Sequence, residues 1–505
     1  MRHINITDKG GLYTSKFAAI GVASSGVTSS GVTSSGFASS GVTSSGFASS
    51  GFAPGRFASK LLLLTSLILL LGFSSFAQQQ GFAHSQKIYS LQDCLTEGLE
   101  NNYSLKMVKN QQRISDNNAT VGNAGFLPSL AVSSSYRGNT QDSETKLRDD
   151  NSIIEDNGIF NQTLDAGIDL NWTIFQGFSV MTNYKKLKEL QNQGELNTRM
   201  AVENLIADLT AEYYNYIQQI IRLKNLQYAV KLSQERLRIV EQRYMIGSFS
   251  GLDYQQAKVD YNSDRSSYMK QIEAVKTSAI TLNELMAHED LDMTLNVADS
   301  VIDVNQTLEL DKMMEQMLAN NASLLYAKKN TYIAELDYKQ KASGSYPYLK
   351  ANAGYGYTMN KYNKGANYHR ATLGADFGLT LGINIFDGNR QRIQRRNARI
   401  NAENVMLDQI DVEQSLKADL YTLWQAYQNN LRILNLEQEN LVAAKDNHEI
   451  AMERYMLGNL SGIEMREAQK SLLDAEERIL KAQYNTKLCE ISLLQISGNI
   501  SAYMQ

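Results

Sequence analysis

Two stretches of the chain alternate apolar and polar residues, which is the period of a β-strand with two unlike faces. They cover residues 163–174 and 371–385, and each has a shorter alternating partner upstream, at about 129–138 and 348–358. A polar segment separates the two strands of each pair, so we expect two β-hairpins. The predicted hairpins span 128–175 and 347–386, with polar loops near 139–161 and 359–369.

Helical periodicity follows each hairpin. Two segments of about 70 residues, 178–246 and 389–457, contain no proline, which would break a helix. In the second segment, apolar residues recur at steps of three and four, as in a coiled coil. Each helix would be about 100 Å long, which is too long for a compact globule. Shorter helices are expected near 90–124, 252–287, 308–342 and 462–497, with an equatorial linker at 288–307.

An internal repeat relates the two halves of the chain. The stretch RYMIGSFSGLD at 243–253 returns as RYMLGNLSGIE at 454–464, an offset of 211 residues. The same offset pairs FQG at 175–177 with FDG at 386–388 and needs no gap between these anchors. Such a register indicates two copies of one structural unit. We place the copies at 88–287 and 308–500.

The N-terminal region has a different composition. Glycine recurs every five residues through much of 1–59, in units such as GVTSS, which predicts a low-complexity extension. Lys60 then precedes the apolar run LLLLTSLILLLGF, and small residues lead to a cleavage site after Ala77. We interpret 60–77 as a secretory signal peptide. A transmembrane anchor is the alternative, but its apolar core would fall short of the roughly 20 residues that a span needs.

The alternating strands have one long apolar side. In a soluble sandwich this side would meet a second sheet, but the export signal favours an apolar face toward lipid and a polar lumen, as in outer-membrane barrels. Four strands cannot close a barrel, and an open edge is not tolerated in lipid. Several chains must therefore share one barrel, and an open channel favours three chains over two. Aromatic residues expected at its borders are Trp172, Phe175, Tyr355, Tyr357, Phe377 and Phe386.

Charge and candidate chemistry exclude several functions. The net charge of −4 shows no basic excess, so nucleic-acid binding is not indicated. No two of the five histidines have metal-ligand spacing, and no phosphate loop, nucleophile elbow or dinucleotide turn occurs. We expect no enzyme, no metal and no cofactor. Cys94 and Cys489 could form one bridge, but two unpaired buried thiols are the favoured interpretation.

The paired turns, the hairpins after FLPSL and SYPYL, and the IFQG and IFDG segments that open the long helices resemble a TolC-family outer-membrane efflux channel. The resemblance covers about 88–500 and implies a mainly α fold with a membrane β-barrel part. It further implies a homotrimer in which long antiparallel helical hairpins form a periplasmic α-barrel below a shared twelve-stranded β-barrel. Such a passive duct would serve a tripartite efflux or type I secretion system, with a periplasmic adaptor and an inner-membrane pump of RND, ABC or MFS type. The exported substrate stays open.

The resemblance also places candidate sites at the two helix–turn–helix tips. These tips would form the periplasmic entrance and contact the adaptor, partly through exposed Arg-Tyr pairs. Helix capping and packing at a turn is the alternative, and it explains the glycines. The candidate adaptor contacts are Arg243, Tyr244, Gly247, Ser250, Arg454, Tyr455, Gly458 and Ser461.

Acidic residues follow each tip. By resemblance Glu464 and Glu467, with Asp253 in the first copy, would form an acidic ring at the entrance that attracts cations. A helix N-terminus favours such residues anyway through its dipole, and this alternative stays open. Leu460 stands where some relatives have an arginine that links neighbouring helices, so the contacts that close the entrance are expected to differ.

Basic residues open the second long helix, where the helix dipole disfavours cations. We expect them to meet anionic headgroups of the inner leaflet, or to pair with neighbouring acids. They are Arg390, Arg392, Arg395, Arg396 and Arg399, with Lys185, Lys186 and Lys188 as weaker counterparts in the first copy.

Two other classes of function compete with the duct. An exported coiled-coil structural or adhesive surface protein would have helices but no strands facing lipid. A diffusion porin would leave the long helices and both tips unexplained.

Overall fold

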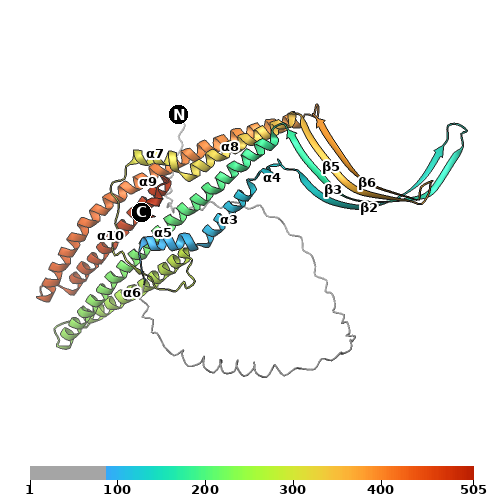
Figure 1. Ribbon diagram of the computed structural model, residues 1–505. Coiled ribbons are helices and arrows are strands. Elements are labelled where there is room, and N and C mark those ends of the chain that lie inside the picture. The colour runs from blue at the N-terminus through green and yellow to red at the C-terminus, as the bar shows by residue number, and fades with distance from the viewer. Residues whose placement is uncertain (1–86, 505) are drawn as a thin grey trace, which may run out of the picture. The chain divides into compact units, whose positions relative to one another are not determined.

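The computed structural model describes residues 87–504, which lie within one compact unit, Ala83–Gln505. The predicted extension at 1–59 and the signal peptide at 60–77 fall outside the described residues. The described part contains two halves with the same order of elements: short helices, a β-hairpin, a long helix and a shorter helix (Figure 1).

Two helical hairpins dominate both halves. Helix α5, Ser179–Met245, packs against α6, Gly251–Met286, and α9, Arg390–Met456, packs against α10, Gly462–Ile496. The two long helices have 67 residues each. Figure 1 shows both turns at the end of the helices opposite to the sheet. None of the helices within 87–504 is long and apolar enough to span a bilayer.

The short helices before each hairpin are broken, so the prediction of single helices at 90–124 and 308–342 is wrong. The first consists of α2, α3 and α4, and the second of α7 and α8. Their bounds are Leu91–Asn101, Tyr103–Asn118 and Val121–Ala124 in the first half, and Leu310–Asn320 and Ala322–Ala342 in the second.

An asparagine causes the main break in each half. Asn102 and Asn321 both have an extended ψ, and the side-chain oxygen of each accepts a hydrogen bond of 3.0 Å from the backbone N–H three residues on. Each thereby caps the next helix. The side-chain amide of Asn102 donates to Leu285 O at 3.0 Å, and that of Asn321 donates to Ile496 O at 2.8 Å. Each short helix therefore bends where α6 or α10 ends.

Four antiparallel strands form one sheet in the order β2-β3-β5-β6. The central pairing, between β3 and β5, joins the two predicted hairpins. Within the described residues β2 and β6 pair on one side only, so each leaves an edge open. The strands span Ser129–Lys146, Ile153–Gln176, Tyr348–Tyr362 and His369–Gly382.

The strands run farther from the helices than the alternating pattern predicts. The turns occupy only 147–152 and 363–368, so the prediction of long polar loops at 139–161 and 359–369 is wrong. Backbone pairing continues there, through a bulge near Gln141, although the apolar–polar alternation is lost. Apolar and polar residues alternate along a strand only where its two faces lie in different environments. At the other end β6 stops at Gly382, three residues before the predicted end.

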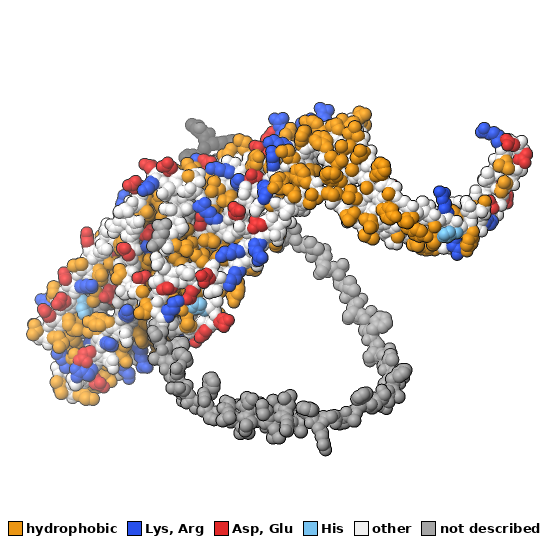
Figure 2. Space-filling model, in the orientation of Figure 1, with side chains coloured by type: hydrophobic (Ala, Val, Ile, Leu, Met, Phe, Trp, Pro, Cys, Tyr) orange, Lys and Arg blue, Asp and Glu red, His pale blue; other side chains and the backbone are white. Residues whose placement is uncertain are grey.

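The register aligns one apolar face across all four strands. Val132 pairs with Ile168, Ile168 with Tyr355, and Tyr355 with Ala375. The exposed side chains of this face include Phe377 at 90%. Figure 2 shows an apolar surface over the part of the sheet nearest the helices. The residues between these positions, such as Asp165, point to the opposite, polar face.

Aromatic side chains sit near the junction of sheet and helices. The indole N–H of Trp172 donates to Phe126 O at 2.9 Å. Phe175 is half-buried and packs edge-to-face on Phe178, with ring centroids 5.2 Å apart. Tyr355, Tyr357, Phe377 and Phe386 are exposed.

The linker at 288–307 crosses the middle of the helices. Its strand β4, Asn296–Val297, pairs in parallel with β1, Ile88–Tyr89. The linker packs against the largest hydrophobic core of the described residues. There the hydroxyl of Tyr213 donates a hydrogen bond to Asp299 at 2.8 Å, and the hydroxyl of Tyr216 donates one to Leu295 O at 2.8 Å. The last described element, after α10, is the short 3₁₀ helix η2, Ile500–Met504.

Both cysteines are free, as the favoured interpretation predicts. Cys94 is fully buried in the core around Tyr213, and burial raises the pKa of its thiol to about 12. Cys489 is only half-buried and lies beside the separate cluster around Tyr427.

Candidate functional site

The two tips are built in the same way by capping boxes. Gly247 and Gly458 have φ of +77° and +79°, the left-handed conformation that ends a helix without the strain of a Cβ. Ser250 then caps α6 and Ser461 caps α10, each accepting from the backbone N–H three residues on, at 3.3 and 3.2 Å. The turn geometry thus accounts for these four candidate residues.

Two of the candidate ring acids complete these caps. The carboxylate of Asp253 accepts from the backbone N–H of Ser250 at 3.1 Å, and that of Glu464 accepts from Ser461 at 3.0 Å. Hydrogen bonds from the Ser461 hydroxyl and backbone lower the pKa of Glu464 below its usual value. Glu467 follows one helical turn later and is exposed. At the second tip, Glu464 and Glu467 are therefore exposed acids one turn apart, as the ring hypothesis requires.

The first tip presents aromatic residues. Tyr244 stacks on Tyr254 with ring centroids 5.5 Å apart and planes within 5°. The guanidinium of Arg243 lies 5.2 Å from the ring centroid of Phe249 and 6.0 Å from that of Tyr455 in the other tip. Both distances suit a cation–π contact. Arg243 therefore reaches from one hairpin to the other.

The second tip differs from the prediction of exposed Arg-Tyr pairs. Arg454 is exposed, but Tyr455 is only 3% exposed, because it points into the joint between the hairpins. It packs there with Ala451, Met465 and Ala468. Leu460 packs against the same cluster, so an apolar side chain stands where the resemblance leads one to expect an arginine.

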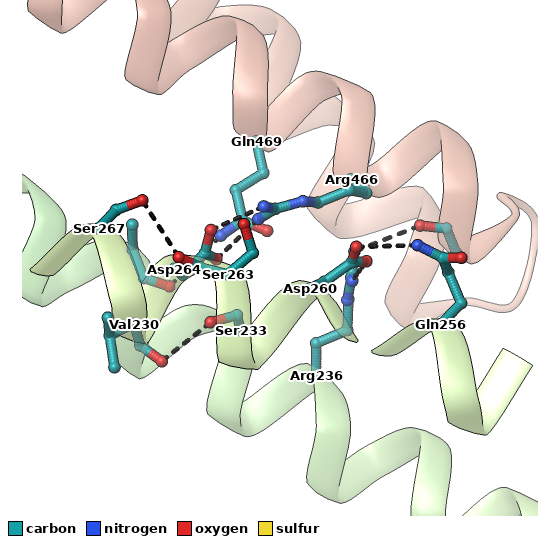
Figure 3. Close-up of polar contacts among 12 residues, drawn as sticks. Val230, Ser233, Arg236, Gln256, Asp260, Ser263, Asp264, Ser267, Arg466 and Gln469 are labelled. Carbon is teal, nitrogen blue, oxygen red and sulfur yellow. Dashed lines mark hydrogen bonds and ion pairs between the residues drawn. The ribbon is translucent and has the colours of Figure 1, made fainter. Parts of the chain in front are cut away.

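Two buried ion pairs lie close to the tips, and one of them joins the two hairpins (Figure 3). The guanidinium of Arg466 on α10 donates two hydrogen bonds of 2.7 Å to the carboxylate of Asp264 on α6. Within the first hairpin, Arg236 pairs with Asp260, which also accepts from Gln256 at 3.0 Å. The side chains of Arg236 and Asp264 are each 7% exposed. A bidentate pair at such depth fixes orientation as well as distance.

Sequence reasoning missed these ion pairs because the repeat draws attention to positions that agree. When the two copies are aligned at the offset of 211 residues, each of the four charged residues matches an uncharged residue in the other copy. The pairs of positions are Arg236 with Asn447, Asp260 with Ser471, Asp264 with Ala475, and Arg466 with Gln255. These ion pairs could have been predicted from charged residues that occur in only one of the two copies, at positions where the helix contacts another helix.

A cavity of about 180 Å³ lies beside the ion pairs, between α5 and the second hairpin. Its lining is largely apolar and includes Leu232, Ile239 and Met452. Tyr455 and Gln469 also line it, and the buried hydroxyl of Tyr455 and side-chain oxygen of Gln469 have no hydrogen-bond partner within the described residues. Buried polar atoms are seldom left unpaired, so the cavity offers one hydroxyl and one acceptor to an incoming group.

The basic residues near the sheet are placed differently in the two halves. Lys186 forms an ion pair of 2.5 Å with Asp337, and Lys188 donates to Gln191 at 3.1 Å, while Lys185 is exposed. The arginines at the start of α9 are all exposed. Within residues 87–504 no group of three or more His, Cys, Asp or Glu side chains is placed to hold a metal ion.

Comparison with known proteins places this geometry among membrane channels. The sequence model of the family described as outer membrane efflux protein matches residues 95–288 and 313–499. Outer membrane protein TolC of Vibrio cholerae is 20% identical over 424 residues, covering 82% of this chain and 91% of that protein.

Two solved structures share the fold. A membrane protein from Pseudomonas aeruginosa has a TM-score of 0.68 at 16% identity, covering 81% of this chain and 90% of its own. The Campylobacter jejuni CmeC outer membrane channel has a TM-score of 0.66 at 15% identity, covering 81% and 85%.

Proposed function

The chain belongs to the outer membrane efflux protein family, and we propose that it is the exit duct of a tripartite export system. Members of this family are channels of the outer membrane that do no chemistry of their own. The predicted location and the absence of enzymatic activity therefore hold for this chain. The adaptor, the pump, the number of subunits and the entrance ring belong to the proposal.

The open edges of the sheet carry the proposal. Within residues 87–504, strands β2 and β6 each pair on one side only, while one face across all four strands is apolar. Backbone N–H and C=O groups left unpaired in lipid each cost several kcal/mol, so the sheet needs further strands from other copies. Three copies would supply twelve strands, enough for an open lumen. The α5–α6 and α9–α10 hairpins would extend this lumen through the periplasm.

The tips are the proposed docking site for a periplasmic adaptor. They lie at the end of the helices farthest from the sheet (Figure 1), and Tyr244, Arg454 and Met456 are exposed there. The cavity beside Tyr455 supports docking, because an apolar side chain that carries a hydrogen-bonding group would fill it and pair its two free polar atoms. The inner-membrane pump would then deliver its cargo through the adaptor.

The entrance ring is the proposed selectivity element. Three copies would bring Glu464 and Glu467 together as six carboxylates around a narrow opening, with Asp253 at the first tip. Such a ring raises the local concentration of cations and repels anions. The exposure of Glu464 and Glu467 one helical turn apart supports this proposal.

The assembly is tested by purifying the mature protein in a mild detergent and measuring its mass by light scattering. We expect the mass of three chains and large, stable conductance steps in a planar bilayer. A monomer that forms no channel would refute the proposal. That result would favour the alternative of a coiled-coil surface protein, which does not explain the apolar face of the sheet.

A further inference from the structure

The apolar face of the sheet borders a group of exposed arginines. The chain leaves β6 through Ile385 and Phe386, which are 93% and 79% exposed, and α9 begins four residues later. Figure 2 shows Lys and Arg side chains gathered where the apolar surface of the sheet gives way to the helices. We call the arginines that open α9 the arginine belt: Arg390, Arg392, Arg395, Arg396 and Arg399.

Most of the arginine belt forms no ion pair with the residues that the structure describes. Arg390 and Arg399 each approach a carboxylate three or four residues away, at 3.8 and 3.2 Å, in exposed pairs that contribute little. Arg392, Arg395 and Arg396 have no carboxylate within ion-pair distance anywhere in the described part of the chain. Arg392 also lies in the first turn of α9, where the helix dipole disfavours cations. Neither local contacts nor the helix accounts for them.

Four of the five arginines in the belt lie on one side of α9, and Arg390 lies on another side. At 3.6 residues per turn, Arg392 to Arg399 fall within about 100° of the helix surface. Gln391, on a second side, donates to Lys341 O of α8, so that side packs inside the chain. Ile393, Ile400 and Leu407 recur every seven residues on a third side and suit packing against another helix. The belt therefore faces outward or into the lumen of a helical wall.

We propose that the arginine belt binds the phosphate groups of anionic phospholipids in the inner leaflet of the outer membrane. The inference rests on the outer-membrane placement of the sheet, since the headgroups of that leaflet lie where its apolar face ends. Guanidinium groups bind phosphate oxygens in a planar, bidentate way. Basic residues close to an anionic membrane surface strengthen binding by about fivefold each. In the first half Lys186 is already paired with Asp337, so the second half supplies the contact.

The test compares two variants of the full-length channel with equal changes in charge. The first is Arg392→Gln/Arg395→Gln/Arg396→Gln. The second is Lys258→Gln/Lys445→Gln/Lys470→Gln, which neutralises three exposed cations in the tip halves of the helical hairpins. Native mass spectrometry of each trimer, with equimolar phosphatidylglycerol and phosphatidylethanolamine, gives the ratio of the two bound lipids. Single-channel conductance in neutral lipid checks that each variant still forms a channel.

We expect the wild-type channel and the lysine variant to prefer phosphatidylglycerol, and the arginine variant to lose at least fivefold of that preference. An unchanged ratio in the arginine variant overturns the proposal, and so does an equal fall in both variants. A change of ion selectivity with an unchanged lipid ratio overturns it as well, because the belt would then line the lumen. Should the triple arginine variant fail to assemble, each single variant is expected to lower the ratio, and no fall in any of them is contrary to the proposal.

Discussion

Arg466 and Asp264 form a bidentate ion pair between the two helical hairpins, with both hydrogen bonds at 2.7 Å. The arginine belongs to α10 and the aspartate to α6, so the pair ties elements that are 202 residues apart in the chain. If the hairpins separate to widen the entrance, this pair has to break. Burial lowers the pKa of Arg466, but its bond to Asp264 and the nearby acids raise the pKa above the usual value overall.

Removing one member of this pair should loosen the entrance. We expect Asp264→Ala to weaken the contact between the hairpins by about 3 kcal/mol, because the guanidinium of Arg466 stays partly buried without its counter-ion. Single-channel conductance in a planar bilayer should rise. The control is Glu437→Ala, which removes the 3.0 Å pair with Arg478 inside the second hairpin. Equal conductance gains in the two variants would argue against a latch between the hairpins.

Neutralising the proposed ring should change ion selectivity without disturbing the tips. In Glu464→Gln/Glu467→Gln the glutamine at 464 can still accept the capping hydrogen bond, so only charge is lost. We expect a lower cation-to-anion permeability ratio, measured from the reversal potential under a salt gradient. Glu289→Gln/Glu309→Gln, which changes two exposed acids at the equator, should leave the ratio as in the wild type. Unchanged selectivity in the first variant rejects the ring.

The two faces of β6 should differ sharply in their tolerance of charge. Leu379 belongs to the apolar face and is 73% exposed, while its neighbour Thr380 belongs to the polar face. Leu379→Arg should destabilise the inserted sheet by about 2–4 kcal/mol, the typical cost near the middle of the bilayer. The fraction of chains in SDS-resistant trimers from outer membranes measures this effect. Comparable losses for Thr380→Arg would mean that the apolar face does not contact lipid.

His448 should make the fold sensitive to acid. Burial lowers the pKa of His448 on α9, and its Nε2 atom has no hydrogen-bond partner among the described residues. The unfolded chain therefore binds this proton more readily than the folded chain. Its contribution to stability is present above the ordinary imidazole pKa and is lost as pH falls through the lowered folded value.

Replacing His448 should remove this sensitivity. The other copy has Leu237 at the matching position, so we expect His448→Leu to be accepted. The difference in Tm between the variant and the wild type should widen in favour of the variant from pH 8 to pH 5. His369→Leu, at an exposed position near the strand turn, serves as the control. A constant difference across this pH range would contradict the assignment.

Helix length and strand alternation follow from the sequence because each is set by local rules. The long helices need only apolar residues at helical steps and no proline between Ser179 and Met245, or between Arg390 and Met456. The strands near the helices alternate because lipid and lumen differ. The breaks at Asn102 and Asn321 depend on carbonyl groups more than 170 residues away, and no local pattern predicts them.

The residues at the tips illustrate the same limit. Gly247 and Ser250 act within their own turn, so the sequence assigns them. Tyr455 looks like its counterpart Tyr244, yet it is buried because it meets Arg243 of the other hairpin. Packing between the hairpins determines whether such a residue is buried. The sequence repeat cannot predict this, because matched positions in the two copies look alike.

Within the described residues, strands β2 and β6 are the edge strands of the sheet, and this affects how mutations in them would be inherited. Each chain would complete the wall of its neighbours, so damage to one edge would spoil an assembly that also contains intact chains. A cell that makes both kinds of subunit would then lose far more working conduits than its share of faulty copies. Edge-strand lesions should accordingly act as dominant alleles.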